Sequence, residues 1–316
     1  MSNTLCPVLG GSLDLGHLRT KSLGRVSGRT PRGFTTASRA RSRRKLPVRP
    51  SVPFTDVTDR MRRRAAATPA DDIDGVTVRI LGVRVDCLDM AGAVGAIERM
   101  VTERGQTCLV ATVNPEFVMR ARVDDHFREV LEGASLCLAD GIGVVWAMRR
   151  QGCPQFERVA GSDLVPALAR SCARHGWRLF LLGARQGVAA ECARRLEVEN
   201  PGLEVAGTFA GSPSPEDDEG ALDRIAAVRP DLLLVAYGAP QQELWIARNR
   251  ERLKVPVAIG VGGTFDFLAG RVRRAPLLLR RAHLEWLWRL ALQPRRVRRM
   301  AVLPGYALAV LRQPHH

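Results

Sequence analysis

Short apolar runs that alternate with amphipathic, helix-like stretches constrain the fold of this chain more than any other feature. The apolar runs, each of strand length, are residues 108–113, 135–139, 178–182, 205–209, 232–237 and 257–261. Helix-like stretches follow near residues 115–131, 141–150, 162–175, 187–196, 216–228 and 241–253. This alternation predicts an α/β fold with a mostly parallel sheet and helices on both of its faces.

The same pattern predicts where a ligand binds. Right-handed crossovers place the carboxyl ends of parallel strands on one edge of the sheet, and open α/β sheets bind ligands at that edge. A short hairpin at residues 78–85 and a helix at 90–104 are expected before the alternation begins.

Positive charge is concentrated at the two ends of the chain. The net charge is +16, with 15 Arg or Lys against 6 Asp in residues 1–75 and 11 Arg against Glu285 alone in residues 271–316. The ends therefore hold +9 and +10, and the remaining −3 falls on residues 76–270. Basic ends favour anionic partners such as phosphates or lipid head groups. An acidic body with only 5% aromatic residues argues against nucleic acid as the partner.

We expect three parts along the chain. Residues 1–75 are rich in Arg, Ser, Gly, Thr and Pro without apolar periodicity, which indicates a disordered basic extension. A later translation start, for example at Met61, explains the same composition equally well. Residues 76–270 hold the α/β domain, and residues 271–316 form a basic helical appendage. In that appendage residues 275–292 are helix-like, and Pro304 interrupts the short apolar run 301–311.

Cysteine and metal-ligand spacing exclude several classes of protein. The seven cysteines form no Cys-x-x-Cys pair, which argues for a reducing compartment and against a disulfide scaffold or a zinc site. No His-Glu-x-x-His or Asp-x-Asp motif is present, so no metal site is predicted. No apolar run reaches the roughly 18 residues that a membrane-spanning helix needs.

Polar residues occur where the first two predicted strands end. Thr112 and Asn114 end the first strand and point to the same side of it, since side chains alternate along a strand. Asp140 ends the second strand, before a glycine-rich helix start. Asn114 and Asp140 each allow two interpretations: an N-cap of the following helix, or a functional group, which for Asp140 is a general base.

Further candidates follow in later loops. Arg158 precedes a helix and is suited to hold a diphosphate by paired hydrogen bonds, although a loop arginine is usually only solvated. The turn at 183–187 leads into a helix N-terminus that can bind phosphate, but it lacks a complete nucleotide-binding fingerprint. The remaining candidates lie after the last two strands: Gly238, Gln242, Gly262, Gly263 and Asp266.

These motifs form an ordered series along the chain. The series is Thr112-Val113-Asn114-Pro115-Glu116, Ala139-Asp140-Gly141, Arg158 before Gly161-Ser162-Asp163, Gly238-x-Pro240-x-Gln242-Glu243, Gly262-Gly263-x-Phe265-Asp266-Phe267, Arg274-Ala275-Pro276, Glu285-Trp286-Leu287-x-Arg289 and Pro294-x-Arg296. Each motif is weak alone, but in this order they resemble the WecG/TagA/CpsF family, glycosyltransferase family 26. The resemblance covers about residues 76–299.

The resemblance implies a Rossmann-like fold of the GT-E type and an activity. Family members transfer N-acetylmannosamine, its uronic acid or glucose from a UDP-sugar to a polyprenyl-diphosphate-linked saccharide, with inversion and without a metal or other cofactor. They act in exopolysaccharide, teichoic acid or surface-antigen assembly. The activity expected here is therefore that of a hexosyltransferase or N-acetylmannosaminyltransferase.

The resemblance also implies roles for individual residues. Asp140 is implied as the base, and Thr112 and Asn114 as the lining of the acceptor side. Arg158 is implied to stabilise the lipid diphosphate or the leaving UDP, and Gln242 to contact the substrate. Gln241 stands where some members have lysine, which leaves the sugar or acceptor preference open.

A lipid-linked acceptor accounts for the basic appendage. We expect the chain to be cytoplasmic and peripherally associated with the inner face of the cell membrane, where each basic side chain adds about 1 kcal/mol of attraction. Trp286 is expected to be a core residue, and whether the chain forms a homo-oligomer stays open. The membrane-associating residues are expected to be Arg289, Arg295, Arg296, Arg298 and Arg299.

Two other functions compete with the transferase. One is a non-catalytic, nucleotide-binding α/β protein whose basic ends bind nucleic acid, with binding that falls steeply with salt. The other is an NAD-dependent oxidoreductase. It is disfavoured because no glycine fingerprint is followed by an acidic residue about 20 positions later.

Overall fold

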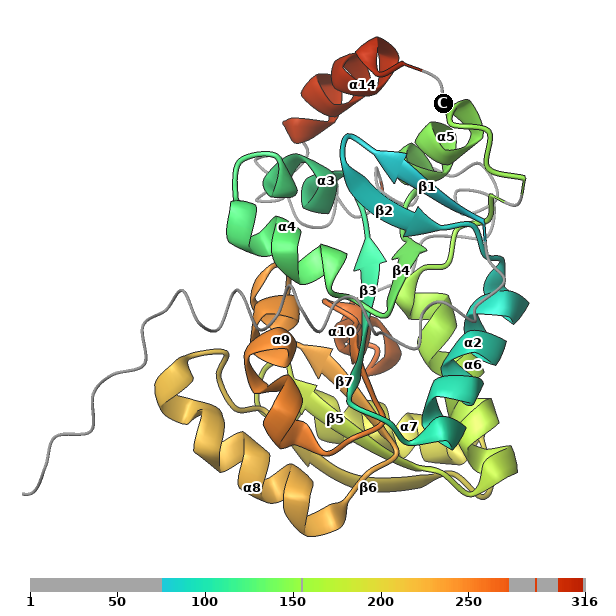
Figure 1. Ribbon diagram of the computed structural model, residues 1–316. Helices are drawn as coiled ribbons and strands as arrows, with labels where there is room; N and C mark the ends of the chain where they lie inside the picture. The colour runs from blue at the N-terminus through green and yellow to red at the C-terminus, as the bar shows by residue number, and fades with distance from the viewer. Residues whose placement is uncertain (1–75, 155, 273–287, 289–300, 315–316) are drawn as a thin grey trace, which may run out of the picture. The chain divides into compact units, whose positions relative to one another are not determined.

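The computed structural model describes residues 76–154, 156–272, 288 and 301–314 (Figure 1). The predicted basic extension, residues 1–75, lies outside these ranges. So do Trp286 and the five arginines assigned to the membrane surface.

A parallel sheet forms the centre of the described chain. Its strands are β3 (Cys108–Val113), β4 (Leu136–Ala139), β5 (Arg178–Gly183), β6 (Glu204–Phe209), β7 (Leu232–Ala236) and β8 (Val257–Gly260). They pair in the order β4-β3-β8-β7-β5-β6. Before them, β1 (Thr77–Ile80) and β2 (Val83–Asp86) form the predicted antiparallel hairpin. The predicted α/β, Rossmann-like sheet is confirmed.

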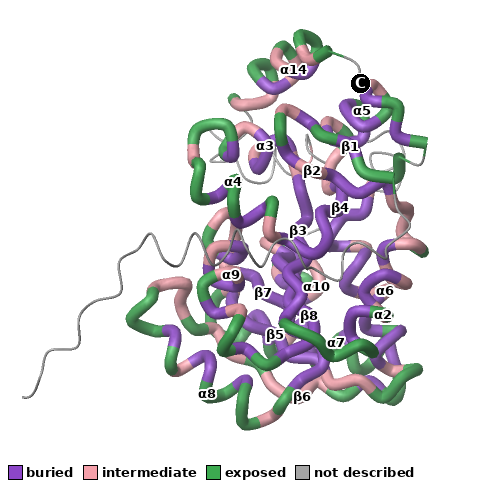
Figure 2. The backbone as a smooth tube through the Cα atoms, in the orientation of Figure 1, coloured by how far each residue is buried: buried purple, intermediate pink, exposed green. Residues whose placement is uncertain are grey.

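Side chains that alternate along the strands enter two separate cores. In β3, Leu109 and Ala111 belong to one core and Val110 to the other. The first core packs under α3 (Pro115–Ala121), α4 (Asp125–Glu132), α5 (Ile142–Arg150), α8 (Asp218–Val228), α9 (Gln241–Leu253) and α14 (Val302–Arg312). The second packs under α2 (Met90–Glu103), α6 (Gly161–His175), α7 (Val188–Glu199) and α10 (Thr264–Leu268). Figure 2 shows β3, β4, β5, β7 and β8 as an almost continuously buried centre, whereas the outer strand β6 is only partly buried.

Two helix predictions need correction. The helix expected at 115–131 is divided in two, because Asp124 caps α4 by accepting a hydrogen bond from Phe127 N–H at 3.0 Å. Pro304 does not interrupt the last apolar run. It lies in the first turn of α14, where proline is tolerated because the first N–H groups have no intrahelical acceptor.

Helix α14 packs onto the α/β domain. Tyr306 and Val310 are buried in the first core, and Tyr306 Oη donates to Gly143 O at 3.1 Å. Gln313 then bonds to the hairpin, accepting from Leu81 N–H at 2.9 Å and donating to Arg79 O at 2.8 Å. Helix α14 is therefore part of the folded body.

The cysteines depart from expectation at one pair. A disulfide joins Cys87 to Cys153, whose Cα atoms are 6.0 Å apart although 66 positions separate them in sequence. No local spacing indicates such a pair, because Cys87 follows the hairpin and Cys153 follows α5, which packs against β1. Cys108 in β3 and Cys137 in β4 are buried free thiols.

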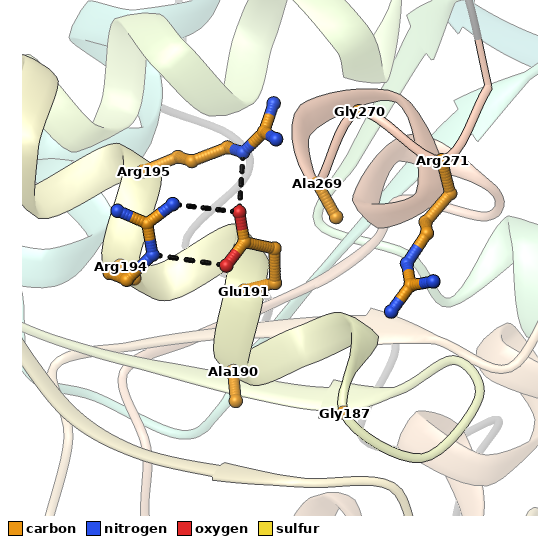
Figure 3. A pocket seen from close by; sticks show the side chains of 8 residues that line it. All are labelled: Gly187, Ala190, Glu191, Arg194, Arg195, Ala269, Gly270 and Arg271. Atoms are coloured by element: carbon orange, nitrogen blue, oxygen red, sulfur yellow. Dashed lines mark hydrogen bonds and ion pairs between the residues drawn. The ribbon is translucent and has the colours of Figure 1, made fainter. Parts of the chain in front are cut away.

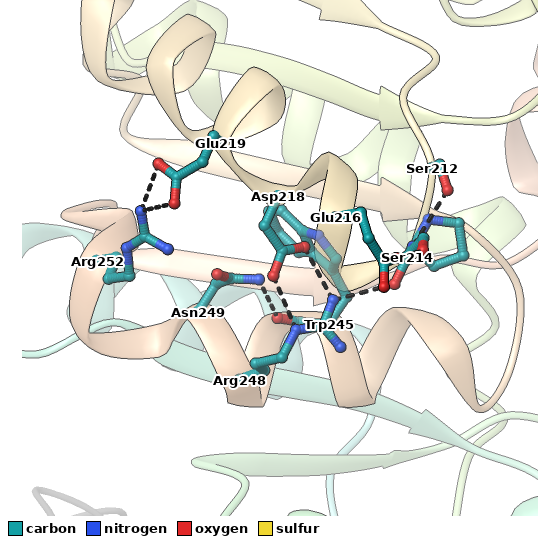
Figure 4. Close-up of polar contacts among 10 residues, drawn as sticks. Ser212, Ser214, Glu216, Asp218, Glu219, Trp245, Arg248, Asn249 and Arg252 are labelled. Atoms are coloured by element: carbon teal, nitrogen blue, oxygen red, sulfur yellow. Dashed lines mark hydrogen bonds and ion pairs between the residues drawn. The ribbon is translucent and has the colours of Figure 1, made fainter. Parts of the chain in front are cut away.

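A buried ion pair joins α8 to α9 (Figure 4). Arg248 donates to both carboxylate oxygens of Asp218 at 2.8 Å, and Asp218 is only 5% exposed. Burial works to raise the pKa of Asp218. The hydrogen bonds from Arg248 and Asn249 outweigh it, so the net pKa is lowered. This pair connects α9 to α8. It therefore helps to position α9, the helix that begins at the candidate site.

Gly183, the last residue of β5, is expected to be essential for the close approach of β5 to β7. Its φ of 102° disfavours other residues, and a Cβ atom there would lie 2.7 Å from the backbone carbon of Ala236. We predict that Gly183→Ala lowers the free energy of unfolding by about 2–4 kcal/mol. Denaturant titration measures this change.

Gly176→Ala is the matched control. Gly176 also has a positive φ, of 67°, but nothing lies within 4 Å of the added Cβ. It should lose only about 1 kcal/mol, the cost of the backbone conformation. Equal losses in both variants would contradict the role of the β5–β7 contact.

Candidate active site

The first two candidate segments meet at the ends of β3 and β4. Val113 and Ala139 are partners in the parallel register, so Asn114 and Asp140 follow neighbouring strand positions. Asp140 N–H donates to Val113 O at 2.7 Å, which extends the pairing by one residue. The structure therefore brings these two candidates together at the carboxyl edge of the sheet.

Asn114 and Thr112 both make structural hydrogen bonds. Asn114 Oδ1 accepts from the N–H groups of Glu116 and Phe117 at 2.9 and 3.1 Å, so Asn114 caps α3. Thr112 is 5% exposed, and its hydroxyl donates to Gly260 O at 3.0 Å. The cap interpretation of Asn114 is confirmed, while its Nδ2 group has no partner among the described residues.

Asp140 is half-buried at the end of β4. The N-cap of α5 is Gly141, whose φ of 115° lies in the region that favours glycine. The interpretation of Asp140 as the cap is therefore wrong, because the carboxylate comes one residue before the cap. A partly exposed carboxylate at a strand end suits proton transfer to and from a ligand.

The loop before α6 brings Arg158 to the same edge. Val159 N–H donates to Ala139 O at 2.8 Å, so the loop runs beside the residue that precedes Asp140. Arg158 donates to Asp163 at 3.1 Å, and the two side chains are 27% and 33% exposed. Such exposed ion pairs contribute only about 0–1 kcal/mol.

Gln242 bridges two glycine loops. Its Oε1 accepts from Gly238 N–H at 3.1 Å and from Gly262 N–H at 2.9 Å. Its Nε2 donates to Glu243 at 2.6 Å, and the residue is 1% exposed. Pro240 is the N-cap of α9 and follows a cis peptide bond. Gln242 thus joins the loop after β7 to the loop after β8.

Glu243 is a fully buried carboxyl group at this edge. Burial raises the pKa of Glu243 to about 8, against smaller opposing effects of the Gln242 and backbone hydrogen bonds. The sequence places Glu243 within a family motif but indicates no role for it. The only signal was a carboxylate on the first turn of a helix that covers the sheet, which usually indicates a solvated end.

The loop after β8 supplies the last candidates. Gly263 is exposed and Asp266 is half-buried on α10. A Cβ atom at Gly161 would lie 3.0 Å from Thr264 Oγ1, so the start of α6 also lies close to this loop. The start of α6 thus lies close to the ends of four strands: β3, β4, β7 and β8.

A separate cavity of about 640 Å³ lies beside α7 and the end of α10 (Figure 3). Gly187, from the turn predicted to bind phosphate, lines it together with Arg194, Arg195 and Arg271. Hydrogen bonds from Arg194 and then Arg195 lower the pKa of Glu191 to about 2. The cavity carries an excess of positive charge, but Thr112, Asp140 and Arg158 do not line it.

Comparison with known proteins identifies the family. The family model described as "Glycosyl transferase WecG/TagA/CpsF family" matches residues 78–316. The chain belongs to this family of glycosyltransferases. It is 36% identical over 234 residues to an N-acetylglucosaminyldiphosphoundecaprenol N-acetyl-beta-D-mannosaminyltransferase of Bacillus spizizenii strain W23, covering 72% of this chain and 90% of that protein. It is 35% identical over 217 residues to the Bacillus subtilis strain 168 protein of the same name, covering 69% and 84%.

Membership of the WecG/TagA/CpsF family confirms the resemblance inferred from the ordered motifs. It also disfavours both competing functions, the non-catalytic nucleotide-binding protein and the oxidoreductase. Within the described ranges, no helix has the length and apolar character needed to cross a membrane. Those ranges also contain no group of three or more His, Cys, Asp or Glu side chains arranged to hold a metal ion.

Substitution of Thr112 tests the structural role of its hydrogen bond to Gly260. Thr112→Val keeps the shape of the side chain but removes the hydrogen bond to Gly260 O. We predict a loss of about 1 kcal/mol in the free energy of unfolding, measured by denaturant titration. Thr112→Ser, which keeps the hydroxyl, is the control for that bond. A loss above about 3 kcal/mol in the valine variant would contradict a single-bond role.

Proposed function

We propose that the chain transfers a sugar from a UDP-sugar to a polyprenyl-diphosphate-linked saccharide, with inversion and without a metal. The sugar is N-acetylmannosamine, its uronic acid or glucose. Family membership establishes glycosyl transfer in cell-envelope polysaccharide assembly. The observation that carries the finer proposal is made where β3 and β4 end. Asn114 and Asp140 directly follow the paired residues Val113 and Ala139, and Arg158 lies in the loop before α6, which bonds to Ala139.

Asp140 is proposed as the general base. Its carboxylate accepts the proton of the acceptor hydroxyl as the hydroxyl oxygen attacks the anomeric carbon of the donor. The bond between that carbon and the diphosphate oxygen breaks, and UDP leaves with the electron pair. One base and an in-line attack are sufficient for inversion. A half-buried carboxylate at a strand end can reach a substrate that lies along the sheet edge.

Arg158 is proposed to stabilise the departing diphosphate. The Val159–Ala139 hydrogen bond holds its loop beside the end of β4, and its guanidinium, which is partly exposed, forms an ion pair with Asp163. A cation that is held in place where negative charge develops lowers the barrier without further reorganisation. Asn114 Nδ2, Gly263 and Asp266 are available to bind the substrates, as the family motifs suggest.

The basic segment is proposed to hold the enzyme against the inner face of the cytoplasmic membrane. The relatives' names state an undecaprenol-linked acceptor, and such a lipid is delivered from a bilayer. Arg289, Arg295, Arg296, Arg298 and Arg299 would contact anionic head groups. The described residues on both sides of this segment pack on the α/β domain, so attraction to the membrane would bring the sheet edge close to it.

The direct test uses the purified full-length protein. It is incubated with a panel of UDP-sugars and a polyprenyl-diphosphate-linked N-acetylglucosamine acceptor, and the product mass is recorded. The proposal expects a mass gain of one hexose, N-acetylhexosamine or hexuronic-type residue from one donor in the panel. No product with any donor would refute it.

Asp140→Asn tests the base. We predict that transfer falls by about 10²–10⁴-fold, because the amide cannot accept the proton, while UDP binding by calorimetry stays within about threefold. Asp223→Asn, an exposed carboxylate on α8, is the matched control and should be unaffected. Near-normal turnover of the Asp140 variant would exclude it as the base.

The membrane role is tested by substitution rather than truncation, because removing α14 would strip Tyr306 and Val310 from the core. Replacing Arg295, Arg296, Arg298 and Arg299 by glutamine should remove about 4 kcal/mol of attraction. We predict a large loss of sedimentation with phosphatidylserine vesicles.

The matched control replaces the same number of arginines in the N-terminal segment, at positions 60, 62, 63 and 64. This variant should sediment with the vesicles like the wild-type protein. If it loses sedimentation as strongly as the first variant, membrane binding is a general effect of charge and not a role of the C-terminal arginines.

A further inference from the structure

Two neighbouring polar side chains at the start of α9 are almost completely buried. Gln242 is 1% exposed and Glu243 is 0% exposed. Glu243 Oε2 has no hydrogen-bond partner in the described part of the chain. Burial of an unpartnered polar atom is costly, and polar arrangements of this kind occur where function requires them. Here the buried polar atom lies next to the glycine loops of the candidate site.

The hydrogen bond between the two side chains decides how the Gln242 amide is oriented. Nε2 donates to Glu243 Oε1 at 2.6 Å, so Gln242 Oε1 faces Gly238 N–H and Gly262 N–H. A flipped amide would set Nε2, a donor, against two further donors. The Glu243 carboxyl and the two glycine N–H groups therefore favour the same orientation of the Gln242 amide, and Glu243 holds its Nε2 end in place.

Gly260 shows that this arrangement is tightly fitted. A Cβ atom at Gly260 would overlap Glu243 Oε1 and lie 2.6 Å from Gln242 Nε2. The carbonyl of the same glycine accepts from Thr112 Oγ1 at 3.0 Å. One contiguous set of contacts thus links the ends of β3 and β8 to the start of α9.

We infer that Glu243 is a positioning residue for sugar transfer: by orienting the Gln242 amide, it fastens the glycine loops after β7 and β8 to each other beneath the site. The inference rests on the proposed function, since the loops are taken to frame its substrates. It assigns Gln242 to supporting the loops rather than to contacting the substrate. Both polar atoms of its side chain are already bonded within the protein.

The charge state of Glu243 gives the inference a pH signature. Glu243 lies beside the Gln242 amide on α9 and Gly260 on β8, and its raised pKa of about 8 comes from burial, with no charged group among its causes. The carboxyl is therefore neutral at pH 7. Above about pH 8 it ionises, and the buried charge at Oε2 has no partner. The loops must then open to hydrate it, and transfer is expected to decline.

The test compares Glu243→Leu, which removes the acceptor, with Glu243→Gln, which keeps Oε1 but cannot ionise. Amide hydrogen exchange at Gly238 and Gly262 is followed by NMR, and kcat and KM are measured across pH. In the leucine variant we expect exchange at both glycines to accelerate at least about tenfold. We also expect kcat to fall about 10²-fold, more than KM changes.

Glu243→Gln should restore slow exchange and near-normal kcat at pH 7, and should stay active above pH 8 where the wild-type protein declines. Glu103→Gln, an exposed carboxylate on α2, is the control and should match the wild-type protein throughout.

Unchanged exchange at Gly238 and Gly262 in Glu243→Leu would overturn the inference. If that variant does not fold, the glutamine variant decides, and an alkaline decline at the same pH as in the wild-type protein would overturn it. Absence of transfer by the wild-type protein with every donor would instead refute the proposed function. The hydrogen-exchange rates at Gly238 and Gly262 would still test whether Glu243 holds the loops in place.

Discussion

Burial of the central strands on both faces is the constraint on which the rest of the structure depends. Every residue of β3, β4, β7 and β8 is buried. Parallel pairing satisfies their backbone groups, and two cores take up their side chains. These strands therefore present polar groups to a ligand only where they end. Polar groups that can bind and convert a substrate are therefore found at the carboxyl edge, because the buried strands offer none along their length.

At this edge the polar groups divide into two kinds. Gln242 and Glu243 are buried and form hydrogen bonds within the protein, and Asn114 Oδ1 caps a helix. Asp140 and Arg158 remain partly exposed. The first kind holds the loops in place, while the second can meet a substrate. Catalysis by a preorganised site needs both, because a base is effective only where the acceptor and donor are held in line.

The C-terminal part is proposed to hold the α/β domain close to its lipid-linked substrate. Val272 N–H bonds to Asp266 O, and α14 inserts Tyr306 into the first core. The basic segment between these points therefore begins and ends on the α/β domain. A peripheral enzyme that acts on a lipid-linked sugar benefits from such an arrangement, because attraction to the bilayer is transmitted directly to the domain that carries the site.

The sequence by itself determined the strands, most helices and the family, because period-two and helical apolar patterns are local and the motifs keep their order. It also located Asp140 and Asn114 at strand ends. Only the tertiary structure decided that Asp140 is not a cap, that Cys87 meets Cys153, and that Glu243 is a buried acid. These outcomes depend on which loops pack together across the sheet, and long-range packing leaves no local trace in the sequence.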